Sequence, residues 1–213
     1  MKGKFIVIEG IEGAGKTSAI NYIAHILRKE HKIKKIKIVR EPGNTPIAEK
    51  LRKLIKKGNK NEELTDISML LLIYAARIQL IKKIIKPSIK KGSWVIGDRH
   101  TLSSFAYQGG GFKIEDKIIN KIHKISMDNF KPNLTLFLDV LPSIGLKRIL
   151  SRKNRDIIEN KSINFFKNTR KKYIKLIKHD KKIIKINANL KINQVYRLIK
   201  NKLNSWIKIE KCL

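Results

Sequence analysis

The sequence predicts an α/β protein in three layers, with a five-stranded parallel sheet between two layers of helices. Short runs rich in β-branched residues alternate with longer stretches of helical periodicity, which is typical of βαβ units. The short runs are almost continuously apolar, as strands are when helices cover both faces of the sheet. The 213 residues contain no Pro/Gly/Ser-rich linker and no internal repeat, so we expect a single domain over residues 1–213.

Strands are expected in the apolar runs, and helices where apolar residues recur at helical spacing. The predicted strands are 5–8, 36–39, 94–96, 134–138 and 183–186. The predicted helices lie near 16–30, 46–56, 66–86, 114–127, 142–152, 161–178 and 191–207. Two helix starts carry candidate caps, since Thr45 stands before Pro46 and Asp139 shortly precedes Pro142.

The formal net charge of +32 requires an explanation, because such a balance usually indicates a nucleic-acid or anionic membrane partner. The lysines are spread along the whole chain, with no stripe rich in arginine and aromatic residues. Lysine, isoleucine and asparagine, whose codons are AT-rich, are abundant while alanine is scarce, so a mutational bias of the genome accounts for the charge. We therefore expect no specific nucleic-acid partner, only incidental salt-sensitive binding to polyanions.

The location of the protein is predicted from its cysteine and its apolar segments. The single cysteine, Cys212, cannot form an internal disulfide, which fits a reducing compartment. Met1 leads directly into the first apolar run without a signal-peptide region, and no apolar stretch approaches the ~18 residues that span a bilayer. We expect a cytoplasmic protein that does not enter a membrane.

The strongest motif follows the first predicted strand and leads into a helix. It matches G-x-x-x-x-G-K-[ST], and the glycines let backbone N–H groups point toward phosphate oxygens while the helix adds its N-terminal dipole. Lys16 would contact the β- and γ-phosphates of ATP, and the Thr17 hydroxyl would ligate Mg²⁺. The predicted ATP-binding segment consists of Gly10, Ile11, Glu12, Gly13, Ala14, Gly15, Lys16 and Thr17.

This P-loop does not by itself separate nucleotide kinases from GTPases, helicases or transport ATPases. A chain of 213 residues has little room beyond one core, which argues against helicases and transporters. No guanine-reading N-K-x-D element follows the fourth predicted strand. Glu12 adds a negative charge beside the phosphates, which suits a protein whose loop carboxylate reaches a second ligand's hydroxyl or an ion bridging two substrates.

The third predicted strand ends in an acidic and a basic residue. Asp98 is placed for Mg²⁺, directly or through water, and Arg99 would reach the acceptor phosphate and the transferring group. An Asp-Arg pair is often only a surface ion pair, but here it stands between an apolar strand and a loop. We therefore expect both residues in a catalytic site.

Together with four further motifs, these residues resemble the bacterial thymidylate kinases from about Lys2 to beyond Ile186. The resemblance implies a nucleoside-monophosphate kinase, usually a homodimer, that uses Mg-ATP to phosphorylate dTMP to dTDP, a step in dTTP synthesis. The motifs that carry it are FIVIEG at 5–10, REPG at 40–43, YAAR at 74–77, DRH at 98–100, AYQGG at 106–110 and LDV at 138–140.

The resemblance also implies roles for individual residues. Glu12 matches a carboxylate near the 3′-hydroxyl of the acceptor sugar, Arg77 an arginine that hydrogen-bonds thymine, and Arg99 one that holds the acceptor phosphate. Tyr107 and Gln108 match residues that pack on the sugar and base, where the tyrosine ring disfavours a 2′-hydroxyl. A buried core position for Tyr107 is the alternative.

Three more positions complete the expected site. Ser104 is expected to bind the acceptor, and Arg148 resembles an arginine near adenine, with a solvated helix charge as its alternative. Ile73 stands where many relatives have a phenylalanine that stacks on thymine. An aliphatic side chain still covers a base but loses the ring–ring contribution of ~0.5–1.5 kcal/mol, so weaker base recognition is expected.

A polar segment near 150–160 is expected to be a mobile lid. Relatives with this type of P-loop carry a catalytic arginine there within Asp-Arg-x-Glu, whereas residues 156–159 read Asp-Ile-Ile-Glu. Phosphoryl transfer needs positive charge around the γ-phosphoryl oxygens, so we expect Arg152 or Arg155 to take the role. The alternative is a solvated basic loop, with the P-loop lysine and the arginine after the third strand sufficient for catalysis.

Three competing functions remain open at this point. A P-loop kinase for another deoxynucleotide or a deoxynucleoside differs in its acceptor. A nucleic-acid-stimulated ATPase, suggested by the charge, would hydrolyse ATP without forming a nucleoside diphosphate in proportion to an acceptor. A non-catalytic nucleotide-binding protein is suggested only by the departure in the lid.

Overall fold

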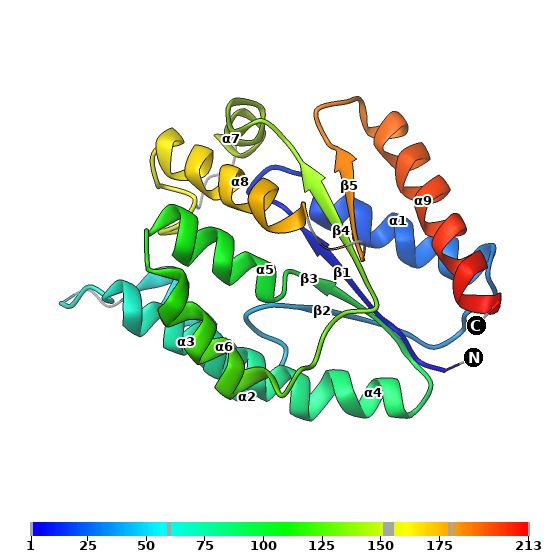
Figure 1. The fold of residues 1–213 in the computed structure, drawn as a ribbon, viewed down its shortest axis with the longest axis horizontal. Coiled ribbons are helices and arrows are strands. Elements are labelled where there is room, and N and C mark those ends of the chain that lie inside the picture. The colour runs from blue at the N-terminus through cyan, green and yellow to red at the C-terminus, as the bar shows by residue number, and fades with distance from the viewer. Residues whose placement is uncertain (1, 59–60, 151–155, 179, 181, 213) are drawn as a thin grey trace.

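The predicted parallel sheet is present in the computed structural model, which describes residues 2–58, 61–150, 156–178, 180 and 182–212. Within this part of the chain, five parallel strands form one sheet in the order β2-β3-β1-β4-β5 (Figure 1). Each strand extends one or two residues beyond its prediction, because polar residues continue the ladder at the carboxyl ends. The strands are β1 Phe5–Glu9, β2 Ile36–Arg40, β3 Trp94–Asp98, β4 Leu134–Asp139 and β5 Ile183–Asn187.

All seven predicted helices are present. The predicted helix 66–86 is divided, because a π-helical turn at Ile81–Ile85 separates α3 from α4. The helices are α1 Lys16–Lys29, α2 Pro46–Lys57, α3 Asp66–Leu80, α4 Lys86–Lys90, α5 Thr101–Ser104, α6 Asp116–Met127, α7 Pro142–Leu150, α8 Ile163–Ile177 and α9 Ile192–Cys212.

One helical segment has no counterpart in the prediction. After β3, α5 continues into a second π-helical turn at Phe105–Gly111. Its three consecutive glycines indicate a loop by composition. Tertiary packing overrides that preference, because α8 lies so close that a Cβ at Gly110 or Gly111 would come within 2.6 or 2.5 Å of α8 side chains.

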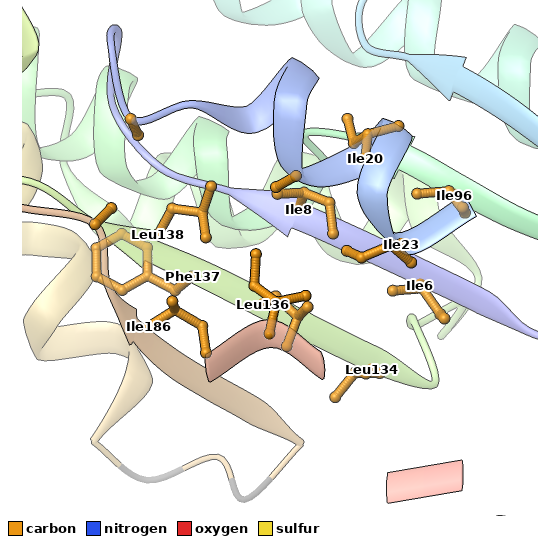
Figure 2. Close-up of a cluster of buried hydrophobic side chains, with 14 of the residues drawn as sticks. Ile6, Ile8, Ile20, Ile23, Ile96, Leu134, Leu136, Phe137, Leu138 and Ile186 are labelled. Carbon is orange, nitrogen blue, oxygen red and sulfur yellow. The ribbon is translucent and has the colours of Figure 1, made fainter. Parts of the chain in front are cut away.

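Alternation along the strands divides the core between the two faces of the sheet. Ile6 and Ile8 of β1 face a cluster built with α1, α8 and α9. Figure 2 shows Ile20 and Ile23 of α1 in this cluster. Phe5 and Val7 point the opposite way and pack with α3 and α6. Helices therefore cover both faces, which confirms the three-layer prediction.

The two predicted caps have different outcomes. Thr45 caps α2, since its Oγ accepts a hydrogen bond of 3.1 Å from the amide of Ala48. The prediction for Asp139 was wrong, because this residue ends β4 and its carboxylate forms an ion pair of 2.7 Å with Arg170. An arginine on α8 thus pairs with the carboxylate that the sequence suggested as the cap of a helix start.

No helix within the described residues is long and apolar enough to cross a membrane.

The strand order places the P-loop at the centre of the sheet. β1 pairs with β3 on one side and with β4 on the other, so the crossover after β1 runs toward β2 whereas the crossover after β3 runs in the opposite direction, to β4. In such sheets ligands bind beyond the carboxyl ends of the strands, at the point where the order reverses. Glu9, Asp98 and Asp139 end the three central strands at this edge.

Candidate active site

The P-loop adopts a backbone conformation that its glycines make possible. Gly13 has φ +72° and Gly15 has φ +88°, where L side chains are strained. At Gly13 the close approach of α7 is a second constraint, because a Cβ would lie 2.0 Å from the carbonyl oxygen of Gly145. Ile11 and Ala14 are buried beneath the loop. Helix α1 begins at Lys16, so its N-terminus faces the cradle.

The Lys16 side chain lies over the loop. Its ammonium donates hydrogen bonds of 3.2 Å to the carbonyl oxygens of both Gly10 and Ile11. Burial and the neighbouring Arg99 lower the pKa of Lys16. A phosphate anion would offset both effects, so this position suits a lysine that binds phosphate oxygens.

A cleft of about 260 Å³ opens beside the P-loop. Its walls come from α2, α3, the end of β3, the helical segment 101–111 and the short stretch that begins at Asp156. It brings together most of the predicted site, which belongs to segments far apart in the sequence. The predicted residues that line it are Glu12, Gly13, Lys16, Ile73, Arg77, Asp98, Arg99, Ser104, Tyr107 and Gln108.

Arg99 lies at the centre of a charged cluster between the P-loop and the segment 101–111. One guanidinium nitrogen, Nη1, donates to the carbonyl oxygen of Gly10 at 2.9 Å and to Ser103 Oγ at 3.2 Å. The other, Nη2, donates to Glu12 Oε1 at 2.5 Å and to the Tyr107 hydroxyl at 3.1 Å. The Tyr107 hydroxyl in turn donates to the second oxygen of Glu12. The cluster therefore holds a cation, a carboxylate and a phenol in mutual contact.

The electrostatics of this cluster follow from its burial. Burial lowers the pKa of Arg99, but Tyr107 and Glu12 outweigh it and hold that pKa well above its usual value. Burial raises the pKa of Tyr107 well above its usual range, so the phenol stays protonated at neutral pH. Arg99 thus presents a permanent positive charge beside the P-loop.

Arg77 occupies the opposite wall and is only 1% exposed. Its Nε donates to Glu41 at 2.5 Å, and its Nη2 donates to the carbonyl oxygen of His100 at 3.1 Å and to Ser104 Oγ at 3.0 Å. Its Nη1 is buried and has no hydrogen-bond partner among the described residues. The guanidinium is thus fixed through two of its nitrogens, and the third keeps its donors unpaired.

The rest of the cleft wall combines apolar and polar side chains. Ile55, Met69 and Ile73 from α2 and α3 provide the apolar surface. Tyr107 and Gln108 enter from the segment 101–111 and are 6% and 3% exposed. An apolar face beside a few directed donors is the usual composition of a site for a planar ligand.

The predicted metal ligands lie on two neighbouring elements. Asp98 lines the cleft, and its Oδ1 is buried without a hydrogen-bond partner among the described residues. Thr17 is exposed in the first turn of α1. No cluster of three or more His, Cys, Asp or Glu side chains is suited to a metal within the part of the chain described. These residues fit Mg²⁺, which is usually bound by one or two carboxylates together with substrate phosphates.

Arg148 contacts the P-loop but does not line the cleft. Its Nη1 donates to the carbonyl oxygens of Gly13 at 3.2 Å and Ala188 at 3.1 Å. The guanidinium therefore bridges the P-loop and the loop after β5. A role near the adenine of ATP stays a prediction.

The predicted lid is described only in part. Arg152 and Arg155 lie outside the described residues. The stretch that follows is docked on α2, since Asp156 forms an ion pair of 2.5 Å with Lys56 and the amide of Ile157 donates to the Lys56 carbonyl oxygen at 3.3 Å. Ile157 does not line the cleft, whereas Ile158 does.

The sequence reasoning assigned no role to three residues that the structure places at the site. Arg52 lines the cleft and donates to the Pro42 carbonyl oxygen at 2.7 Å. Its spacing from Ile55 on the predicted helix 46–56 was the available signal, because residues three apart share a face. Glu41 holds Arg77, and Glu9 is 0% exposed beneath Arg99. No local pattern indicates these two long-range contacts.

Comparisons with known proteins agree with this site. The sequence model of the thymidylate kinase family matches residues 8–199. The chain is 57% identical to the thymidylate kinase of Buchnera aphidicola subsp. Schizaphis graminum over 207 residues, 97% of each chain. It is 46% identical to that of Vibrio parahaemolyticus, covering 97% of this chain and 98% of that protein.

A solved structure gives the same result in three dimensions. The crystal structure of thymidylate kinase from Ehrlichia chaffeensis superposes with a TM-score of 0.77 at 27% identity, covering 96% of this chain and 99% of that one. The similarity covers nearly the full length of both chains, so the fold prediction is confirmed. With the P-loop, the arginine-lined cleft and relatives matched over nearly their full length, the chain belongs to the thymidylate kinase family.

Proposed function

We propose that the protein transfers the γ-phosphoryl group of Mg-ATP to dTMP, forming dTDP and ADP in the synthesis of dTTP. The observation that carries this proposal is the convergence of the P-loop with Arg77, Arg99 and Tyr107 on one cleft. A phosphoryl group can pass directly between two nucleotides only when the donor and acceptor sites adjoin, and Arg99 touches both sides.

The acceptor is proposed to lie against the wall formed by α2, α3 and the segment 101–111. The unpaired Nη1 of Arg77 is a donor for a carbonyl oxygen of thymine, and Ile73 covers one face of the base. Tyr107 limits the room at the 2′ position of the sugar. Arg99 and Arg52 are the cations available for the acceptor phosphate.

The donor is proposed to bind the P-loop amides and Lys16, with Arg148 near the adenine. Thr17 and Asp98 would hold Mg²⁺, which neutralises charge on the phosphates when bound. Lys16 must exchange its contacts with the Gly10 and Ile11 carbonyl oxygens for phosphate oxygens. Positioning and charge neutralisation, rather than covalent chemistry by the protein, then carry the rate.

The segment 150–160 is proposed to close over the reacting groups and exclude water, which would otherwise compete as acceptor. The docking of Asp156 on Lys56 supports this, because it fixes one end of the segment beside the acceptor wall. We propose that Arg152 or Arg155 supplies the arginine that position 157 lacks. Alanine variants of each residue test this assignment.

The assembly is proposed to be a homodimer in the cytoplasm. Leu71 on α3 and Ile125 on α6 are 50% and 86% exposed, and the two helices are in contact, so an apolar surface is available there. Light scattering at several concentrations tests the oligomeric state. A mass of one chain throughout would contradict the proposal.

One experiment tests the activity. The protein is incubated with Mg-ATP and, separately, dTMP, dUMP, dGMP, thymidine or DNA, and the phosphorylated products are identified. We expect dTDP in proportion to ADP with dTMP, and no product from a Lys16→Ala control. ADP release stimulated by DNA, without a nucleoside diphosphate from any acceptor, would refute the proposed function and favour a nucleic-acid-stimulated ATPase.

A further inference from the structure

The last residue of β1, Glu9, is a completely buried carboxylate directly beneath the charged cluster. Its Oε1 accepts hydrogen bonds from the amides of His100 at 2.8 Å and Ser103 at 3.2 Å. Its Oε2 accepts from Ser103 Oγ at 2.6 Å and from the Tyr173 hydroxyl at 2.8 Å. Four donors from two distant segments thus converge on one side chain.

A carboxylate is costly to remove from water, so the burial of Glu9 calls for a reason. Burial raises the pKa of Glu9, although its hydrogen bonds and the nearby Arg99 act in the opposite direction. Within the described residues Glu9 forms no ion pair, whereas Glu41 and Asp139 are each paired with an arginine. What Glu9 holds is the turn that carries Arg99.

That turn is strained at the arginine itself. Arg99 has φ +71°, a conformation that non-glycine residues rarely adopt. Its amide donates to the Ile8 carbonyl oxygen at 2.9 Å, and the next amide, of His100, donates to the Glu9 side chain. β1 therefore ties down both amides, one through its backbone and one through a carboxylate, and the strained conformation is maintained.

The same carboxylate also orients a side chain that contacts Arg99. Ser103 directs its hydroxyl proton toward Glu9, which leaves oxygen lone pairs to accept from Arg99 Nη1 at 3.2 Å. Tyr173 lies 2.8 Å from the same Ser103 oxygen and stacks on Phe137 of β4, with ring centroids 4.9 Å apart. The Ser103 hydroxyl is thus in contact with Glu9, Arg99 and Tyr173 at once.

The two ends of the guanidinium consequently face different surroundings. The Nη1 end contacts the Gly10 carbonyl oxygen and Ser103, a residue at the edge of the cleft whose hydroxyl is fixed by Glu9. The Nη2 end contacts Glu12 and Tyr107, which line the cleft where the acceptor is proposed to bind. An acceptor phosphate can replace the contacts of Nη2 while those of Nη1 persist.

We propose that Glu9 is a positioning residue for phosphoryl transfer: through Ser103 and the amide of His100 it holds the Nη1 end of Arg99 in place, so that the Nη2 end is free to exchange Glu12 for the acceptor phosphate. This inference rests on the proposed function, since it assumes that Arg99 binds that phosphate. It assigns Glu9 a role beyond supporting the fold.

The test compares Glu9→Gln and Ser103→Ala with wild type. The glutamine amide would donate to Ser103 and turn the serine proton toward Arg99, so two donors would face each other while the side-chain volume stays the same. Ser103→Ala removes the link and keeps Glu9, so it remains informative if the buried substitution prevents folding. The matched control is Tyr196→Phe, which loses one hydroxyl on the α9 surface while its ring still stacks on Tyr22.

Affinity for dTMP and for thymidine is measured by calorimetry, together with kcat. We expect both test variants to bind dTMP roughly tenfold more weakly, the effect of one lost hydrogen bond to a charged group. Thymidine affinity should be unchanged, because thymidine lacks the phosphate that Arg99 would hold. The control should match wild type in every measurement.

A second measurement separates positioning from general structural damage. In an Arg99→Met background, Glu9→Gln should cause no additional loss of dTMP affinity, because its effect passes through the arginine. Equal losses for dTMP and thymidine, or a full additional loss in that background, would overturn the inference. If the wild type binds and phosphorylates dTMP normally and the Glu9→Gln and Ser103→Ala variants bind dTMP as tightly as it does, this inference alone is overturned. If the wild type makes no dTDP, the proposed function is overturned as well.

Discussion

Replacing Arg77 by methionine should destabilise the protein strongly, because it leaves a buried carboxylate without its main cation. The side chains of Arg77 and Glu41 are 2% and 3% exposed and joined at 2.5 Å. Removing one member of such a pair typically costs ~3–5 kcal/mol of unfolding free energy. His100 remains hydrogen-bonded to Glu41 at 2.7 Å, so we expect the lower end, ~3 kcal/mol.

The stability lost in Arg77→Met should depend on pH, because it arises from the negative charge of Glu41. Burial raises the pKa of Glu41, but His100 and Arg77 outweigh it and lower that pKa overall. The stabilisation is therefore fully present above the usual carboxyl pKa of about 4.3 and lost as pH falls through the depressed native pKa. The deficit of Arg77→Met should be largest near neutral pH and should narrow in acid, where a protonated Glu41 needs no cation.

Urea unfolding at several pH values measures the unfolding free energies of wild type, of each single variant and of the double variant Glu41→Gln/Arg77→Met. The double variant should recover part of the loss, because its buried amide carries no charge. A single-variant loss below ~1 kcal/mol, or a double variant as unstable as the sum of both single changes, would refute the reasoning.

Three further predictions concern the site. Ile73→Phe should lower the KM for dTMP several-fold, since a ring–ring contact contributes ~0.5–1.5 kcal/mol, and an unchanged KM would contradict the base-stacking hypothesis. Alanine at one of the two positions, Arg152 or Arg155, should reduce kcat about 10³-fold with little change in KM for ATP, and full turnover by both variants would exclude them from catalysis. Gly13→Ala should abolish ATP binding in a calorimetric titration, because its Cβ would lie 2.0 Å from the Gly145 carbonyl oxygen. A thermal melt should still show a folded protein. Normal ATP affinity of the variant would show that the loop can shift.

Local patterns predicted most of the fold. Apolar runs and helical periodicity predicted the strands and helices whose own residues carry the pattern of burial. Thr45 was identified as a helix cap because Pro46 follows it. The segment 101–111 was not predicted, because its helical form depends on contact with α8 rather than on its own residues. Asp139 was assigned to a helix start because nothing local reveals its partner Arg170.

The residues of the candidate site also fall into those that short motifs predict and those that only the structure reveals. The P-loop, the pair Asp98-Arg99 and the departures at Ile73 and 157 could be read from short motifs, because each motif lies within a few residues. Glu9 could not, since its role depends on contacts with distant segments. Arg52 shares a helix face with Ile55, but nothing local shows that this face lines the cleft. The roles of the motif residues toward ligands stay predictions.

The sequence by itself determined the α/β class, the phosphate cradle and the family, because strand–loop–helix units and phosphate binding are encoded in contiguous residues. Only the tertiary structure decided that β1 lies between β3 and β4, that Arg77 is held by Glu41 with one donor unpaired, and that Glu9 lies beneath Arg99. The physical reason is that a buried polar group must find its partner in space, and that partner is set by the packing of the whole chain.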